Sequence, residues 1–237
     1  MILDNYYQIQ QNQVRISRRQ ASDFAKGVAN DFNPIHDVDS KRFCVPGDLL
    51  FSLVLRHYGL SQRMHLQFAG LVNDQVTLIF PDDQGERITL TGDNGKAYLH
   101  LERSGEVSHD PVLIERLILE YVAFSGKAFP HLLVPLMESK GVMINPDRPL
   151  VIYESMALHL DRLNLEQPRL RPTTPELEAQ GKRGLVTLNF DLLDGDEVIG
   201  GGYKKMVLSG LQPFDAERMA QVVAHYNQRA QAGSASG

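Results

Sequence analysis

One stretch of sequence decides the fold: Pro46-Gly47-Asp48-Leu49-Leu50-Phe51-Ser52-Leu53-Val54-Leu55-Arg56-His57-Tyr58-Gly59. It is apolar nearly all round, opens with Pro-Gly and closes with a glycine. These features predict a buried helix over about 47–59 that Gly59 ends as a C-cap. A helix that is apolar on every side must be enclosed, and antiparallel strands can curl about it. The stretch therefore predicts an α+β unit in which a sheet wraps one central helix.

Short runs rich in Val, Ile, Thr and Leu follow this stretch, as such a sheet requires. They fall at about 65–72, 75–80, 86–92 and 96–103. Before the stretch, the sequence predicts a strand within 7–17 and a helix over about 20–29. The first half of the chain thus contains all the elements of one wrapped unit.

The second half repeats this order in weaker form. Asp110-Pro111 begins one predicted helix, and an apolar helix over 129–140 ends at Gly141. Strands are predicted at about 150–161, 184–193 and 197–209, with a final helix at about 213–230. Pro46 and Pro130 occupy matching points, 130 − 46 = 84 residues apart. We therefore expect an internal pseudo-repeat, with central helices at 47–59 and 129–140 under one continuous sheet.

This pattern predicts three segments along the chain. Residues 1–107 form the first wrapped unit, 108–211 form a second, and 212–237 form a C-terminal helix with a flexible tail from Gln231.

Charge and cysteine content narrow the classes of partner. The 237 residues include 24 Lys plus Arg and 29 Asp plus Glu, so the formal charge is 24 − 29 = −5 with histidine neutral. No basic run is longer than a pair, which argues against a nucleic-acid partner. The single cysteine, Cys44, can form neither an internal disulfide nor a cysteine-based metal site, and this fits a reducing compartment.

Targeting signals are not visible in the sequence. The first residues lack the cationic and apolar regions of a secretory signal. The longest apolar stretch, 49–55, is far shorter than the roughly 20 residues that span a bilayer. We expect a cytoplasmic protein with no membrane partner.

The chemistry is concentrated in Asn30-Asp31-Phe32-Asn33-Pro34-Ile35-His36-Asp37-Val38-Asp39. Asn33 followed by Pro34 has the form of a helix N-cap with proline at the first position, so a local turn is predicted. That turn would bring Asp31 and His36 toward one pocket, where a carboxylate and an imidazole could act on a shared water as an acid/base pair. The alternative is structural, with Asp31 and Asn33 as caps and His36 half exposed in a loop.

The surroundings of this string add specificity. Phe24-Ala25 precedes it, and Phe43 with the Pro46-Gly47 helix start follows it. Over about residues 20–55 the chain resembles the MaoC-like, (R)-specific enoyl-thioester hydratases of the hot-dog superfamily. The resemblance implies a double hot-dog fold and hydration of an enoyl thioester, or dehydration of a 3-hydroxyacyl thioester. It also implies that no metal and no cofactor take part.

The resemblance assigns roles to five residues. Asp31 and His36 would hold and activate the water, and Asn33 would shape the loop. Backbone N–H groups near Gly47 and Asp48 would receive the thioester carbonyl, since a helix start offers free donors. The expected partner is an acyl thioester of coenzyme A or of acyl carrier protein. The chain itself is expected to be a monomeric pseudo-dimer or a homodimer.

Several positions depart from the family pattern. Asn30 replaces a glycine, Asp39 lies one position late, Lys41-Arg42 replaces a small residue, and Asp48 stands where an apolar residue is common. These departures support an alternative function from another class, a non-catalytic hot-dog module that binds an acyl thioester or fatty ligand.

The second half has no such string; its corresponding link is only Ser125–Ala128. We therefore expect one site per chain, with an apolar pocket that runs from Asp31 and His36 toward the interface between the halves. The helix at 129–140 should border it, kinked at Pro135. Its predicted bordering residues are His131, Leu132, Leu133, Pro135, Leu136 and Met137. Lys204-Lys205 is interpreted as part of a solvated strand face, with contact to a coenzyme A phosphate as the alternative.

Overall fold

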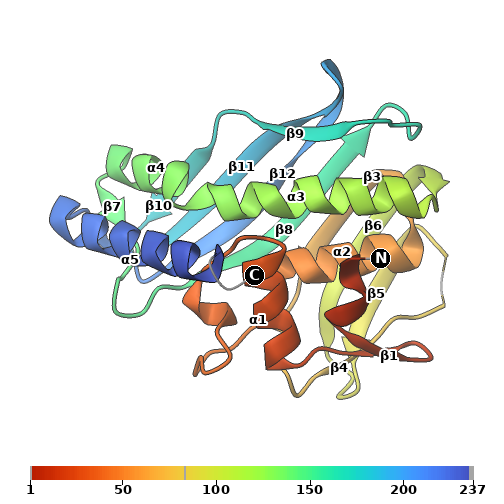
Figure 1. Ribbon diagram of the computed structural model, residues 1–237, viewed down its shortest axis with the longest axis horizontal. Helices are drawn as coiled ribbons and strands as arrows, with labels where there is room; N and C mark the ends of the chain where they lie inside the picture. The colour runs from red at the N-terminus through yellow and green to blue at the C-terminus, as the bar shows by residue number, and fades with distance from the viewer. Residues whose placement is uncertain (1, 83, 235–237) are drawn as a thin grey trace.

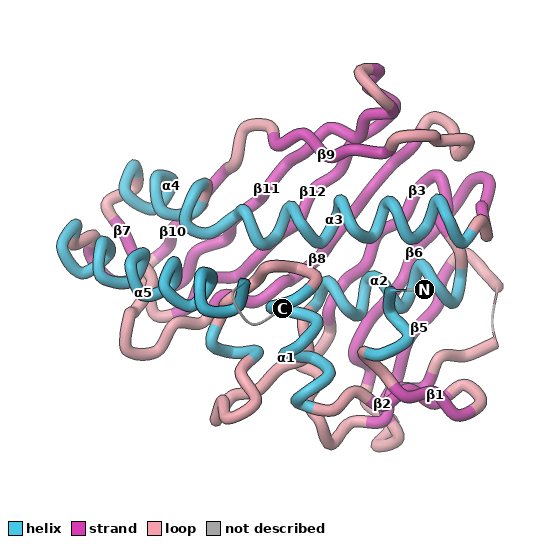
Figure 2. The backbone as a smooth tube through the Cα atoms, viewed as in Figure 1, coloured by secondary structure: helices cyan, strands magenta, loops and turns pink. Residues whose placement is uncertain are grey.

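A computed structural model describes residues 2–82 and 84–234 of the chain. Its main layer is one antiparallel sheet of 11 strands within this described part. Two helices, α2 (Gly47–Tyr58) and α3 (Pro111–His131), lie side by side on the same face of that sheet (Figure 1). The other helices flank this pair, as the tube in Figure 2 shows.

The first half of the sheet surrounds α2. Its strand order is β1-β2-β4-β5-β6-β3. The bounds are β1 (Gln8–Gln10), β2 (Gln13–Arg15), β4 (Thr77–Ile79), β5 (Arg87–Gly92), β6 (Ala97–Ser108) and β3 (Leu60–Phe68). A short helix, η1 (Ile2–Asn5), precedes these strands, and α1 (Arg18–Gly27) and η2 (Pro34–His36) connect β2 to α2.

The second half continues the same sheet under α3. β3 pairs with β8, where Met64 lies opposite Leu158, and the order then runs β8-β12-β11-β10. The bounds are β8 (Val151–Leu160), β12 (Glu197–Ser209), β11 (Arg183–Asp194), β10 (Glu176–Gln180) and β9 (Pro168–Pro172), which also pairs with β11. β9 and β10 were not predicted, because each is five residues long and prolines punctuate the segment.

This topology confirms the predicted fold class. Two helices lie on one face of a continuous antiparallel sheet. A C-terminal helix, α5 (Ala216–Ser234), follows a small β7 (Val142–Met143) and β13 (Gln212–Pro213) pair. This is the double hot-dog arrangement. The segment boundaries at 107 and 211 stay a prediction.

The second central helix is not the one predicted. The helix beside α2 is α3, which begins at Pro111, whereas 129–140 was expected. Phe129 has non-helical dihedrals (φ −110°, ψ 128°), because the residue before a proline is disfavoured in the α region. The chain beyond Pro130 forms only the short α4 (Leu133–Ser139). Pro130 is therefore not the counterpart of Pro46, and Ser125–Ala128 lies inside α3 rather than in a link.

The C-terminal segment also differs from expectation. The predicted flexible tail began at Gln231, but α5 continues to Ser234, and residues 235–237 lie outside the described part. In α5, Met219 is buried, and Val222, Val223 and Tyr226 are partly buried, so these residues form its packing face.

A buried ion pair ties both central helices to the sheet. Lys204 in β12 is fully buried, and its ammonium donates to Asp48 Oδ1 of α2 at 2.8 Å. It also donates to Tyr121 O and Ser125 Oγ of α3, at 2.7 and 2.6 Å. The prediction of a solvated face was wrong for Lys204, because strand alternation places Lys204 inward and Lys205 outward.

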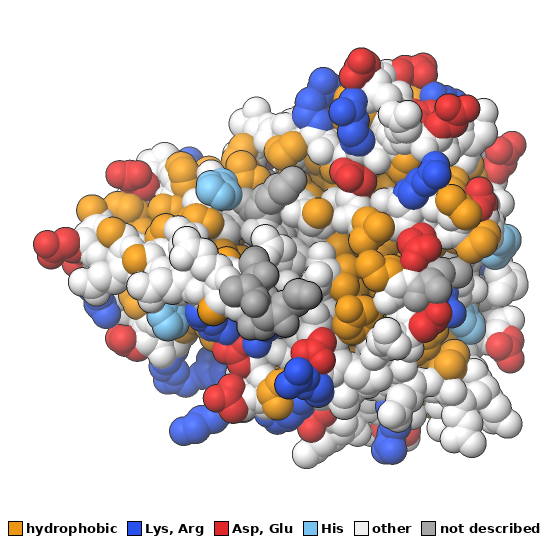
Figure 3. Space-filling view, in the orientation of Figure 1, with side chains coloured by type: hydrophobic (Ala, Val, Ile, Leu, Met, Phe, Trp, Pro, Cys, Tyr) orange, Lys and Arg blue, Asp and Glu red, His pale blue; other side chains and the backbone are white. Residues whose placement is uncertain are grey.

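The helical face exposes some apolar side chains (Figure 3). Val112 and Leu119 of α3 are among the exposed large hydrophobic residues. None of the helices within residues 2–82 and 84–234 is long and apolar enough to cross a membrane.

Lys204→Met should lower the free energy of unfolding by about 3–5 kcal/mol, because it leaves the Asp48 carboxylate buried without a partner. Adding Asp48→Leu should recover much of that loss, since the charge is then removed as well. Lys205→Met, next in the strand but facing outward, should cost about 1 kcal/mol or less. Urea unfolding of the four proteins measures these differences. Equal losses in the free energy of unfolding for Lys204→Met and Lys205→Met would contradict the structural role given to the Asp48–Lys204 ion pair.

Candidate active site

The end of α1 fixes Asp31. The helix starts with a capping box between Ser17 and Gln20 and ends near Val28. Asn30 then adopts a positive φ of 52°, and the Asp31 N–H donates to Ala25 O at 2.7 Å. Asparagine tolerates this left-handed conformation better than most residues with a side chain. Asn30 is therefore suited to the backbone turn that presents Asp31.

The predicted turn at Asn33 is present as the single-turn helix η2. Asn33 Oδ1 accepts from the Ile35 N–H at 3.2 Å, and Pro34 occupies the first helical position. The Asn33 N–H donates to Asp31 Oδ1 at 2.9 Å, while its side-chain amide donates to Val151 O of β8 at 3.3 Å. Asn33 thus shapes the loop and fastens it to the second half of the sheet.

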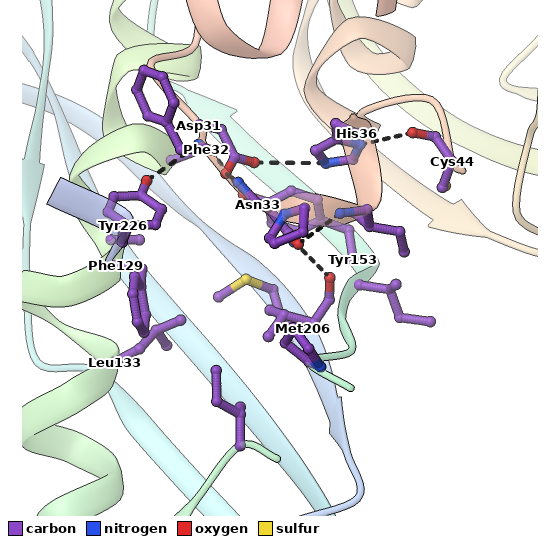
Figure 4. Close-up of a pocket in the computed structure, with 18 of the residues that line it drawn as sticks. Asp31, Phe32, Asn33, His36, Cys44, Phe129, Leu133, Tyr153, Met206 and Tyr226 are labelled. Atoms are coloured by element: carbon purple, nitrogen blue, oxygen red, sulfur yellow. Dashed lines mark hydrogen bonds and ion pairs between the residues drawn. The ribbon is translucent and has the colours of Figure 1, made fainter. Parts of the chain in front are cut away.

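Asp31 and His36 face each other across this turn (Figure 4), with Asp31 Oδ2 3.6 Å from His36 Nε2. His36 Nδ1 lies 2.7 Å from Cys44 O. A carbonyl oxygen can only accept, so Nδ1 carries a proton, and in the neutral ring Nε2 is the free base. The pair therefore has a basic nitrogen directed at a carboxyl group.

Burial changes the acidity of Asp31. Removal from water raises its pKa above the usual value, while the nearby His36 and the Asn33 N–H act in the opposite direction. The side chain is 20% exposed, so it remains in contact with the pocket. A carboxyl group with a raised pKa can hold a proton for transfer, which is what a general acid needs.

The start of α2 faces the same space. Its N-cap, Pro46, provides no side-chain acceptor, and the first N–H groups of a helix have no intrahelical partner. Gly47 lines the pocket, and a Cβ there would lie 2.9 Å from the Tyr153 ring. The Asp48 side chain instead points away to Lys204, so it contributes no free carboxylate to the pocket.

These groups open into a pocket of about 400 Å³, a size typical of small-ligand sites. Both halves of the chain and α5 line it, so it lies where the halves meet (Figure 4). Its apolar lining includes Phe32, Leu50, Phe68, Phe129, Leu133 and Met206.

Of the predicted bordering residues, Leu133 lines this pocket and Met137 is buried in the core. His131, Leu132, Pro135 and Leu136 are not part of the lining. Pro135 sits in the first turn of α4, where proline is tolerated, and the chain bends at Phe129 instead.

Tyr153 is a lining residue that the sequence did not indicate. In β8 the side chains of Met156 and Leu158 point inward, so regular alternation would place Glu154 inward as well. The register shifts at this point, because Lys205 lies opposite Ser155 and Met206 lies opposite Tyr153. The resulting bulge directs Tyr153 toward the helices, where its hydroxyl donates to Ser125 Oγ at 2.8 Å.

A close helix contact supports the loop from the second half. A Cβ at Gly126 of α3 would lie 2.1 Å from Ala29 O and 2.8 Å from Asn30 O. Only glycine permits this approach of α3 to the backbone that precedes Asp31.

α5 forms the outer wall. The Tyr226 ring contacts Phe32 and Phe129, with centroid distances of 5.9 and 4.9 Å. Arg229 pairs with Asp37 at 2.5 Å, which ties the helix to the loop that carries His36. Within the described residues, no three His, Cys, Asp or Glu side chains cluster as metal ligands. The expectation that no metal or cofactor takes part stays a prediction.

The family described as "Protein of unknown function (DUF3581)" matches residues 1–217. The chain belongs to this family. Among curated proteins, a search found no match for this DUF3581 chain.

Solved structures similar to this DUF3581 chain include a MaoC-like dehydratase, with 10% identity and a TM-score of 0.44 over 86% of this chain and 97% of that one. A conserved protein of unknown function with a hot-dog fold from Alicyclobacillus acidocaldarius has 9% identity and a TM-score of 0.46, over 88% and 98%. An acyl-CoA thioesterase II from Mycobacterium marinum has 12% identity and a TM-score of 0.39, over 91% and 99%. The resemblance to MaoC-like hydratases in particular stays a prediction.

Gly126→Ala should destabilise the protein by about 1–3 kcal/mol, because the added methyl group must displace the Ala29–Asn30 backbone. Helix propensity alone would make the alanine variant more stable, so a lower free energy of unfolding can be attributed to the close contact. Gly27→Ala is the matched control, since nothing lies within 4 Å of its added Cβ. Thermal and urea unfolding measure both variants. A stabilised Gly126 variant would show that the contact is loose.

Asp31→Asn should stabilise the protein at neutral pH and lose that advantage in acid. The raised pKa means that the folded state favours the protonated carboxyl of Asp31. The contribution of this carboxyl to the free energy of unfolding is therefore fully present below the unfolded pKa of about 3.9. It is lost as pH rises through the folded pKa. Asparagine cannot ionise and escapes the loss. Urea unfolding from pH 4 to 8 tests this, with Asp39→Asn in the exposed part of the loop as control. If the gain in the free energy of unfolding of Asp31→Asn over wild type shrinks as pH rises, the prediction is wrong.

Proposed function

We propose that this chain hydrates a trans-2-enoyl thioester to a 3-hydroxyacyl thioester, or catalyses the reverse dehydration. The observation that supports the proposal is the Asp31–His36 contact of 3.6 Å at the edge of an apolar pocket. A carboxyl and an imidazole that share one proton always offer one acid and one base.

The hydration step uses both members of the pair. One takes a proton from water as the water oxygen bonds to C3, and the alkene electrons move toward the thioester carbonyl. The other then gives its proton to C2, and the carbonyl forms again. The pair still holds a single proton, and transfer between Nε2 and Oδ2 restores the starting state.

The charge that develops on the thioester oxygen needs donors. We assign this role to the N–H groups at the uncapped start of α2, near Gly47, where the helix dipole also favours negative charge. The departure at Asp48 does not oppose this charge, because the Lys204 ammonium neutralises the carboxylate. The other unusual side chains, Lys41 and Arg42, are exposed and lie outside the pocket lining.

A separation of Asp31 and His36 greater than one water can bridge would favour the non-catalytic alternative. The 3.6 Å contact lets both groups reach the same water, so the geometry favours the enzyme. The acyl group would be linked to coenzyme A or to acyl carrier protein, and we place its apolar chain against Phe129 and Leu133.

Asp31→Asn and His36→Ala should each lower kcat by roughly 10²- to 10⁴-fold, because each removes one partner in proton transfer. The measurement is loss of enoyl absorbance with crotonyl-coenzyme A and longer trans-2-enoyl thioesters. His159→Ala, an exposed histidine on the outer face of β8, is the control and should keep wild-type rates. Turnover that persists in both loop variants would remove these residues from the mechanism.

A further inference from the structure

Two hydroxyl groups, Ser125 and Tyr153, border the pocket but have no part in the hydration step. We call them the hydroxyl pair. Their oxygens lie 2.8 Å apart, and both residues line the same cavity as Asp31 and His36. Ser125 is almost fully buried in α3, and Tyr153 is partly exposed in β8.

Lys204 polarises this pair. Its ammonium has three N–H donors, and three acceptors surround it, namely Asp48 Oδ1, Tyr121 O and Ser125 Oγ. Burial lowers the pKa of Lys204 below its usual value, while the Asp48 carboxylate acts in the opposite direction and favours the charged form. With every proton bound to an acceptor, Lys204 cannot serve Ser125 as a base, so the geometry does not make Ser125 a nucleophile.

The hydroxyl pair retains one O–H proton that is not used in the hydrogen bonds around it. Ser125 Oγ accepts from Lys204 and from the Tyr153 hydroxyl, which fills both of its lone pairs. Ser125 then keeps its own O–H proton. If Ser125 instead donates its proton to the Tyr153 oxygen, the Tyr153 O–H is the group that is left to donate elsewhere. In both arrangements one O–H group of the pair has no acceptor among the described residues. Ser125 and Tyr153 both line the pocket, so this O–H group can donate to a ligand there.

The environment keeps the pair as a donor. Burial and the Asp48 carboxylate raise the pKa of Tyr153 well above its usual value, so the phenol stays protonated. A hydrogen bond from the Lys204 ammonium draws electron density from Ser125 and strengthens the donor at the far end of the chain.

We propose that the hydroxyl pair binds a second oxygen atom of the ligand, so that the pocket selects acyl thioesters with a carbonyl oxygen along the acyl chain. The inference rests on the proposed function, because the ligand is taken to be an acyl thioester. Tyr153 sets the place of the second oxygen. One edge of its ring lies against Gly47 of the first half, near the expected thioester end, and its hydroxyl lies at Ser125 of the second half.

Calorimetry with the full wild-type chain tests this selection. The probes are hexanoyl-coenzyme A and its 3-, 4- and 5-oxo derivatives, which add one acceptor oxygen at successive carbons. At least one oxo ligand should bind about 2- to 10-fold more tightly than hexanoyl-coenzyme A, the range expected for one added hydrogen bond. Equal or weaker binding of all three would overturn the inference and leave the proposed function standing. No binding of any probe would overturn both.

Variants locate the contact. Tyr153→Phe leaves the Ser125 hydroxyl and should retain part of the preference, whereas Ser125→Ala/Tyr153→Phe should abolish it and leave hexanoyl-coenzyme A binding within about twofold of wild type. Tyr203→Phe, in the neighbouring strand β12, is the matched control and should keep the full preference. A preference that survives in the folded double variant would assign the contact to another group.

The double variant removes an acceptor from Lys204, so a measurement on the wild-type chain is also needed. A crystal structure with the tightest oxo ligand should place the added oxygen about 3 Å from Ser125 Oγ or Tyr153 Oη. An added oxygen beside Asp31 or His36, or in an apolar part of the pocket, would overturn the inference.

Discussion

The buried ion pair between Asp48 and Lys204 is the constraint on which the rest of the structure depends. It links α2 to β12, and the remaining N–H groups of the same ammonium bind α3. A charge buried without a partner costs several kcal/mol, so neither helix can shift along the sheet without a large loss of stability. The two central helices are thereby held in a fixed relation to β12 of the sheet.

This fixed relation lets residues from distant parts of the chain share one pocket. The first half contributes the Asp31–His36 pair and the start of α2. The second half contributes no copy of that pair, but its helix supports the backbone before Asp31 at Gly126, and β8 supplies Tyr153. The second half is therefore a wall and a support rather than a second site.

Local features of the site could be predicted from the sequence, and long-range ones could not. The turn that joins Asp31 to His36 is specified within a few residues by Asn33 and Pro34. Tyr153 depends on a bulge that changes which side chains face inward, and alternation alone would have placed Glu154 there. Lys204 and Asp48 are 156 residues apart, so their pairing follows only from the assembled sheet. The second central helix was misplaced because the apolar run at 129–140 resembled the first, while Pro130 interrupts it.

The position of α5 has a consequence for how this family can diversify. The family match ends at residue 217, and the α5 residues against the pocket, such as Val222, Tyr226 and Arg229, lie beyond it. A relative that has Asp31 and His36 in the matched region but ends in a different segment would place this pair behind a different outer wall. The shape of the pocket can then change through the C-terminal segment alone, without any substitution in the loop from Asp31 to His36.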